Sequence, residues 1–134
     1  MRKTDMIRYY VPVRRLGDTT IEEQKGYCVY YVDPSTDDVY HFMIRKVGKG
    51  WQVDQYETGY VIGRSYPTYR EACATVLWMI KYKDLIKTLD VTLAHVWDRD
   101  GKFLNEDVPS KYCSGAVQIY LPEERSENNA AGIT

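Results

Sequence analysis

The sequence predicts an α+β fold, in which an antiparallel meander packs on one main helix and a C-terminal β-hairpin and strand follow. Short β-rich runs separated by turn residues fill the first half of the chain, as expected for strands joined by tight connections. A helix start follows them, because Pro67 precedes Thr68-Tyr-Arg-Glu71, a Ser/Thr-x-x-Glu capping box. The 134 residues suit one domain, which we place at residues 1–122. The polar tail, residues 123–134, is expected to be disordered.

The predicted strands follow in chain order. Residues 6–13 form the first, and Pro12 places it at a sheet edge because proline cannot donate to a neighbouring strand. Residues 14–25 are expected to form a polar connection with one helical turn at 20–23. Residues 27–32 form the second strand, and a turn cluster follows it. Three further strands, at residues 39–47, 51–56 and 60–66, complete an antiparallel meander with short loops.

The helix is expected to run from Tyr69 to about Leu89, and a break near Lys83 and Asp84 is the alternative that gives two shorter helices. Alternating apolar residues over 91–97 predict another strand. Asp100-Gly101 is a hairpin signal, with residues 102–104 as the return strand. A last strand is predicted at residues 116–121, where Pro122 ends it.

The composition narrows the class of protein. The net charge is −1, and the longest apolar run, residues 72–80, is too short to span a bilayer. The chain shows no basic and apolar leader, so we expect no membrane association and a cytoplasmic location. Three widely spaced cysteines form neither a disulfide framework nor a zinc motif.

No group of residues predicts catalysis or metal binding. His41 and His95 lie in predicted strands, away from any cysteine or second histidine at ligand spacing. Asp98-x-Asp100-Gly101 is similar to part of a calcium loop, but Val96 occupies the first ligand position and has no side-chain oxygen. We therefore expect no metal, no cofactor and no enzymatic activity.

Tyrosine is the compositional outlier, with 13 Tyr against 2 Phe. Such rings suit partly buried sheet faces and interfaces, where large aromatics and Arg carry much binding energy. The main prediction is a small non-enzymatic protein that binds a protein partner. Its size and style suggest a regulator or inhibitor from a phage or mobile element. The expected contact residues are the exposed aromatics near the sheet edge and helix start, with one arginine: Trp51, Tyr56, Tyr60, Arg64, Tyr66 and Tyr69.

The expected helix carries a second apolar stripe, turned away from the one that covers the sheet. It consists of Trp78, Tyr82, Leu85 and Leu89. Either the C-terminal strands cover this stripe or it forms a twofold homodimer, and the sequence leaves both open.

Nucleic-acid binding is the alternative function. Its candidate residues lie on a basic sheet edge and near a basic N-terminal arm: Arg14, Arg15, Arg45, Lys46, Lys49 and Arg64. Residues 39–83 also carry the pattern Trp51-x-Val53, Gly59-x-x-Ile62-Gly63-x-x-Tyr66 and Thr68-x-x-Glu71-Ala72.

That pattern resembles the three-stranded-sheet-plus-helix module of ethylene-response-type DNA-binding domains and of the arm-binding domains of phage integrases. In those families Arg and Lys of the sheet face enter the major groove. Arg45, Lys46 and Arg64 match this character, whereas the corresponding strand carries Gln52, Asp54, Gln55 and Glu57. The resemblance therefore implies the local fold more than the activity.

Overall fold

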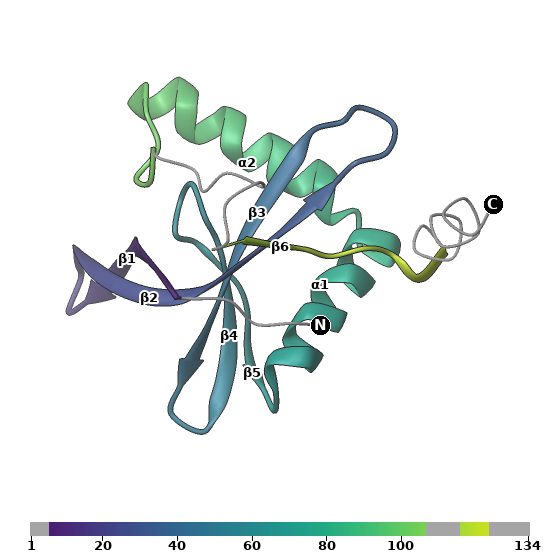
Figure 1. Cartoon of the computed structure of the whole chain (residues 1–134). Coiled ribbons are helices and arrows are strands. Elements are labelled where there is room, and N and C mark those ends of the chain that lie inside the picture. Colours follow the sequence, from purple (N-terminus) through teal and green to yellow (C-terminus); the bar gives the residue numbers. More distant parts are fainter. Residues whose placement is uncertain (1–5, 107–115, 124–134) are drawn as a thin grey trace.

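The computed structural model describes residues 6–106 and 116–123. Its elements in chain order are β1 (Ile7–Arg15), β2 (Asp18–Val32), β3 (Val39–Val47), β4 (Gly50–Gln55), β5 (Val61–Tyr66), α1 (Tyr69–Tyr82), α2 (Leu85–Asp100) and β6 (Ala116–Gln118). The strands follow the order β1-β2-β3-β4-β5, and β6 pairs with β2 (Figure 1). The expected tail beyond Glu123 lies outside the described residues.

The predicted α+β class is confirmed: an open antiparallel sheet carries two packed helices. Each strand from β1 to β5 pairs antiparallel with the next, as the short connections predict. β1 lies at the edge, in agreement with Pro12. The expected C-terminal strand is present as β6, which adds to β2 in parallel.

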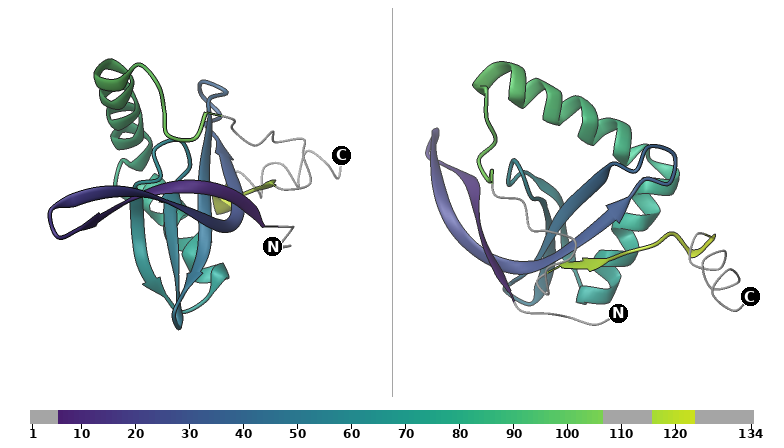
Figure 2. Two further views of the ribbon diagram at one scale, coloured as in Figure 1. Left: turned by 90° about the vertical axis from the view of Figure 1, so that its left-hand side faces the viewer. Right: turned by 45° about the horizontal axis from the view of Figure 1, so that its top comes forward.

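The β1–β2 hairpin is longer than predicted. Residues 14–25 form no polar connection with a helical turn, because β2 begins at Asp18 and pairs with the whole of β1 across the two-residue turn Leu16-Gly17. The second half of β2 pairs with β3. Near the change of partner lies Gly26, where an added Cβ would come within 3.0 Å of the Ile44 carbonyl oxygen. Because Gly26 has no side chain, β2 can bend close to β3 at this point. The hairpin beyond the bend projects from the sheet (Figure 2).

The sheet buries side chains on both faces. One face packs on α1 and α2, with Phe42, Ile44 and Val53 in its centre. The other buries Met43 and Cys28 beneath Tyr9 and Val11 of β1. Successive side chains of a strand point to opposite faces, so Phe42 and Met43 contribute to different cores. The hairpin therefore closes the face that the helices leave open.

The expected helix start is correct. Thr68 has extended backbone angles, and its Oγ1 accepts a 3.0 Å hydrogen bond from the Glu71 amide. The helix ends at Tyr82, so the alternative with two helices is the correct one. Asp84, with φ of 51°, separates α1 from α2 in the left-handed region.

The strand predicted at residues 91–97 and the hairpin at Asp100-Gly101 are wrong. These residues continue α2, because Leu85, Leu89 and Val96 recur on one helical face and are buried. Gly101, with φ of 69°, ends the helix and its amide donates to the Trp97 carbonyl at 2.7 Å. The Asp-Gly pair is thus a helix C-terminus instead of a β-turn.

Candidate functional site

An open groove runs along α2 on the side that faces the sheet and the hairpin. It consists of two hollows of about 530 Å³ and about 260 Å³, which share Thr58 and Tyr60. The larger hollow lies between the hairpin and the C-terminal half of α2, where Pro12, Ile21, Val96 and Leu104 line it. The smaller lies between β5 and the N-terminal half of α2, and we call the two together the α2 groove.

Different contacts hold the two ends of α2. At the first end Leu85 and Leu89 join the helix-side core, and the Tyr40 hydroxyl donates to Asp90 Oδ1 at 2.8 Å. At the other end the rings of Trp97 and Phe103 lie 5.3 Å apart. The contact with Phe103 links the end of α2 to the segment that carries Asn105.

Asn105 fixes the segment that follows α2. Its Nδ2 donates to the carbonyls of Tyr10 and Tyr56 at 2.9 and 2.7 Å, and its Oδ1 accepts from the Tyr10 amide at 2.8 Å. The side-chain amide thus pairs with the free edge of β1 as a neighbouring strand would. The Asn105 amide also donates to the Glu57 carbonyl at 3.0 Å. One buried residue therefore holds the hairpin, the β4–β5 turn and the end of α2 together.

The β4–β5 turn presents Tyr60 to the groove. Gln55 Oε1 accepts from both the amide and the hydroxyl of Thr58, at 2.8 and 2.7 Å, and the Thr58 hydroxyl accepts from the Tyr60 amide. Gly59, with φ of 71°, lies against β1, since an added Cβ would lie 2.4 Å from the Tyr10 carbonyl oxygen. The turn is held on both sides, so Tyr60 is displayed from a rigid base.

A buried carboxylate links β1 to the sheet on the hairpin side. Asp54 is fully buried; its Oδ2 accepts from Tyr9 at 2.6 Å and from Arg45 Nε at 3.0 Å, and its Oδ1 accepts from Gln52 at 2.8 Å. Burial and the Asp54 charge raise the pKa of Tyr9 above its usual range. Three donors satisfy the carboxylate. The carboxylate at its centre has no contact with solvent, so the geometry of the cluster supports a structural role.

A second polar cluster lies beneath the β4–β5 turn. Glu57 Oε1 lies 4.0 Å from His41 Nδ1, and Gln55 Nε2 donates to Glu57 Oε2. Burial raises the pKa of Glu57, which the hydrogen bond from Gln55 only partly offsets. The pair does not line the α2 groove. His95, predicted in a strand, lies exposed on α2.

The predicted partner-binding residues do not form one surface. Tyr56 and Tyr69 are only 4% and 7% exposed, so the expected exposure of these two is wrong. Tyr56 belongs to the hairpin-side core, and Tyr69 packs edge-on to Trp51 with ring centroids 5.8 Å apart. Tyr60 lines the α2 groove. Arg64 and Tyr66 lie on β5, away from it, with Arg64 exposed.

The basic residues predicted to bind nucleic acid do not form one surface either. Arg45 is held by buried Asp54, and Arg15 pairs with Glu22 at 3.0 Å. Arg14 lines the α2 groove. Lys46 lies over the Trp51 ring at 5.2 Å, near the exposed Lys49 of the β3–β4 turn. Arg64, on β5, completes the set.

The four residues of the predicted second apolar stripe are split between two helices, because α1 ends after Tyr82. Trp78 and Tyr82 are exposed on α1, with ring centroids 6.0 Å apart. Leu85 and Leu89 are buried at the start of α2 as part of the core. The break at Asp84 turns the second pair inward, so the four residues share no exposed face.

The two cysteines in the described part of the chain are buried. Cys28 and Cys73 are buried and free, and burial raises the pKa of Cys73 to about 11. Such a thiol stays protonated at neutral pH and is a poor nucleophile. Residues 6–106 and 116–123 contain no group of three His, Cys, Asp or Glu side chains placed to bind a metal ion. In the same residues, the helices are too short or too polar to cross a bilayer.

No family model, curated protein or solved structure matches the chain. The resemblance to ethylene-response-type and integrase arm-binding domains therefore stays a prediction. Sequence reasoning missed Ile21, Val96 and Leu104, which line the groove, and Asn105, which holds the segments around it together. The run of β-branched residues Thr19-Thr20-Ile21 was a usable signal for a strand. The contacts of Asn105, in contrast, depend on residues about 50 and 95 positions away.

Proposed function

We propose that this protein is a non-enzymatic binding protein, and that the α2 groove holds an apolar segment of a protein partner. One observation carries the proposal: exposed apolar side chains gather along this groove. Ile21, Tyr60, Val61 and Leu104 are all exposed large hydrophobics, and all line it. Exposed apolar patches that line a concave surface are typical of interaction sites.

The rigidity of the groove supports the same proposal. The hairpin is tied to the sheet through Tyr9 and Asp54, and the end of α2 is tied to both through Asn105. A partner that enters a preformed groove loses less binding free energy to ordering. The chemistry of the walls favours apolar side chains in the centre, with polar groups toward Arg14, Arg99 and Asp100.

The experiment compares capture by the wild-type protein and by two matched variants. Ile21→Asp places a charge in the groove, and Val47→Asp makes the same change at the end of β3. Both are β-branched residues on strands, with 53% and 44% exposure. We expect the partner retained by the wild-type protein to be lost by Ile21→Asp and kept by Val47→Asp.

Isothermal titration calorimetry with the purified partner measures how much binding free energy each variant loses. A groove contact should cost about 2 kcal/mol or more of binding free energy when a carboxylate is buried in it. Equal affinities for the two variants would contradict the proposal. The narrower suggestion of a phage or mobile-element regulator rests on size and style alone and stays a prediction.

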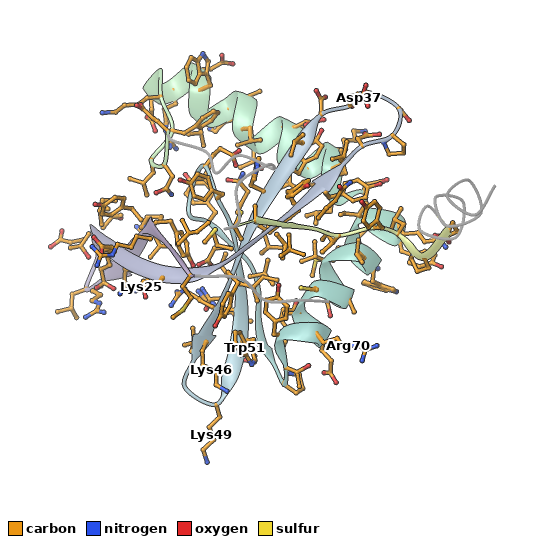
Figure 3. All side chains as sticks on the ribbon, in the orientation of Figure 1. Lys25, Asp37, Lys46, Lys49, Trp51 and Arg70 are labelled. Carbon is orange, nitrogen blue, oxygen red and sulfur yellow. The ribbon has the colours of Figure 1, made fainter. Side chains whose placement is uncertain are left out.

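Nucleic-acid binding remains the second candidate, because Lys46 and Lys49 of the predicted basic set lie together at one end of the molecule. Figure 3 shows Lys46, Lys49 and Arg70 at that end, with Asp37 at the opposite one. If this end binds phosphates, the affinity for a labelled DNA duplex should fall steeply between about 50 and 200 mM salt. Lys46→Gln with Lys49→Gln should reduce that salt dependence. No binding at low salt would exclude this candidate.

A further inference from the structure

Cations gather at the end of the sheet where β3 turns into β4. Residues 44–51 and 62–70 contain no Asp or Glu. Four exposed cations belong to these segments, and none forms an ion pair within the described part of the chain: Lys46, Lys49, Arg64 and Arg70. We call these four residues the basic end, and Figure 3 shows three of them, Lys46, Lys49 and Arg70, at one end of the molecule.

The charge of the basic end is not neutralised by its neighbours. Arg45, which precedes Lys46, is held by the buried Asp54, so that this carboxylate is already satisfied. Glu71 follows Arg70 and adds one exposed carboxylate beside the four cations. The surface therefore keeps an excess of positive charge, which favours a negatively charged partner.

Two aromatic rings lie among these cations. Trp51 of β4 is opposite Lys46 of β3 on one side and opposite Tyr66 of β5 on the other. Residues opposite each other on neighbouring strands place their side chains on the same face, so the three form a row across the sheet. Lys46 Nζ lies 5.2 Å from the centroid of the Trp51 ring, and both rings are partly exposed. The row thus combines positive charge with aromatic surface.

The backbone around Tyr66 is strained and closely packed. Ser65, directly before it, has φ of 65°, which is uncommon for a residue other than glycine and costs conformational free energy. An added Cβ at Gly50 would lie 3.2 Å from Ser65 Cα, so the end of β5 lies against the β3–β4 turn. Gly63 has no side chain, and the Tyr66 hydroxyl lies where its Cβ would be. Strain of this kind is common at ligand-binding sites.

We propose that this end of the sheet binds single-stranded nucleic acid, with phosphates on the basic end and bases against the rings of Tyr66 and Trp51. Lys and Arg attract the phosphates of any nucleic acid, but aromatic side chains stack on bases only where the bases are unpaired. A basic surface that also carries aromatic rings is therefore suited to a single strand. The proposal rests on the second candidate function, which it narrows, and it is independent of the α2 groove.

Fluorescence anisotropy with the full chain tests which form of nucleic acid binds. The probes are a labelled DNA strand of about 15 nucleotides, an RNA strand of the same length, and the matching DNA duplex. At about 150 mM salt, at least one single strand should bind about fivefold or more tightly than the duplex, since each stacked base contributes about that factor. Its affinity should fall roughly 50-fold between about 50 and 200 mM salt, as expected for four neutralised phosphates.

Two pairs of lysine substitutions locate the binding surface. Lys46→Gln with Lys49→Gln removes half of the basic end, whereas Lys83→Gln with Lys87→Gln removes two exposed lysines near the start of α2. The first pair should weaken single-strand binding about tenfold, because two phosphate contacts are lost. The second pair should change it less than about twofold. All four side chains are exposed, so neither pair should unfold the protein.

Two substitutions of Tyr66 test base stacking. Tyr66→Phe and Tyr66→Leu both remove the hydroxyl, but only Phe keeps an aromatic ring. Tyr66→Leu should bind the single strand at least about fivefold more weakly than Tyr66→Phe. Melting curves of both variants show that the comparison is made between folded proteins.

Three results would overturn the proposal: a duplex bound as tightly as either single strand, lysine pairs that weaken binding equally, or equal affinities of Tyr66→Leu and Tyr66→Phe. A tightly bound duplex would still retain nucleic-acid binding as the second candidate function. No binding of any probe at about 50 mM salt would exclude both. Binding in the α2 groove is measured separately by the capture experiment.

Discussion

The Tyr9 hydroxyl donates a 2.6 Å hydrogen bond to Oδ2 of Asp54, although β1 and β4 are not neighbours in the sheet. The bond crosses the face that α1 and α2 leave open. It joins the edge strand to a carboxylate that has no contact with solvent. The position of the hairpin, and with it one wall of the α2 groove, depends on this pair and on the apolar residues around it.

Tyr9→Phe should destabilise the fold by about 1.5–3 kcal/mol, the range for a lost hydrogen bond to a charged group. Arg45 and Gln52 still donate to Asp54, so the chain should remain folded. Urea unfolding followed by tryptophan fluorescence measures the change. Tyr10→Phe is the control, because the exposed Tyr10 ring should contribute less than about 0.5 kcal/mol. Equal losses for both variants would contradict a specific role for the Tyr9–Asp54 bond.

Gly59→Ala should be much more costly than Gly101→Ala. The two glycines have φ of 71° and 69°, but an added Cβ meets the Tyr10 carbonyl oxygen at 2.4 Å in one case and nothing within 4 Å in the other. Gly101→Ala should cost about 1 kcal/mol for positive φ alone. Gly59→Ala should cost about 1–3 kcal/mol more, because β1 must move away. Thermal unfolding of the pair measures the difference, and similar melting temperatures would refute the close approach of the turn to β1.

Asn105→Ala should loosen the hairpin edge. The substitution removes the partners of the Tyr10 amide and of two carbonyls, at a cost of about 2 kcal/mol or more. Hydrogen exchange of the Tyr10 amide should accelerate, while that of Ile44 in the central strand should change only with global stability. Glu106→Ala, at the exposed next residue, should leave both unchanged. A Tyr10 amide that stays protected from exchange in this variant would show that Asn105 is not needed to hold the edge of β1.

Glu57 should make stability depend on pH in the direction opposite to that of a salt-bridged carboxylate. Burial raises its pKa in the folded state above the ordinary 4.5, so the folded protein binds this proton more tightly than the unfolded chain. Its contribution to stability is present below about pH 4.5 and is lost as the pH rises through the folded-state pKa.

Glu57→Gln tests this, because it keeps an acceptor for Gln55. At pH 8 the variant should be more stable than the wild type, because it places no charge at this buried position. The difference should shrink as the pH falls toward the raised pKa. Melting curves between about pH 4 and pH 8 provide the comparison. A variant that is less stable at pH 8 would contradict the assignment.

The elements that follow from local chemistry could be predicted. Pro12 marked an edge strand, and Thr68 and Glu71 marked the helix start. β3 occupies residues 39–47 as predicted, because turn residues directly precede and follow it in the sequence. The helix break at Asp84 was predictable only as an alternative, since the chain continues with good helix formers on both sides.

The other elements were mispredicted because their residue patterns fit both a strand and a helix. Val91, Leu93, His95 and Trp97 alternate like a strand, but Leu85, Leu89 and Val96 also lie on one helical face. Leu16-Gly17 is an unusual turn pair, so the hairpin was missed. The α2 groove could not be predicted, because its walls come from the hairpin and from α2, which lie far apart in the sequence.

Site-specific photo-crosslinking tests the central claim most directly. A benzophenone amino acid replaces Ile21 in the α2 groove, and in a second protein it replaces Val47 at the β3–β4 turn. Both proteins are irradiated in an extract of the source cells, and crosslinked chains are identified by mass spectrometry. A groove that binds a protein should give a discrete crosslinked species from position 21 and none of the same mass from position 47. Equal yields of that species from both positions, or from neither, would contradict a partner-binding role for the α2 groove.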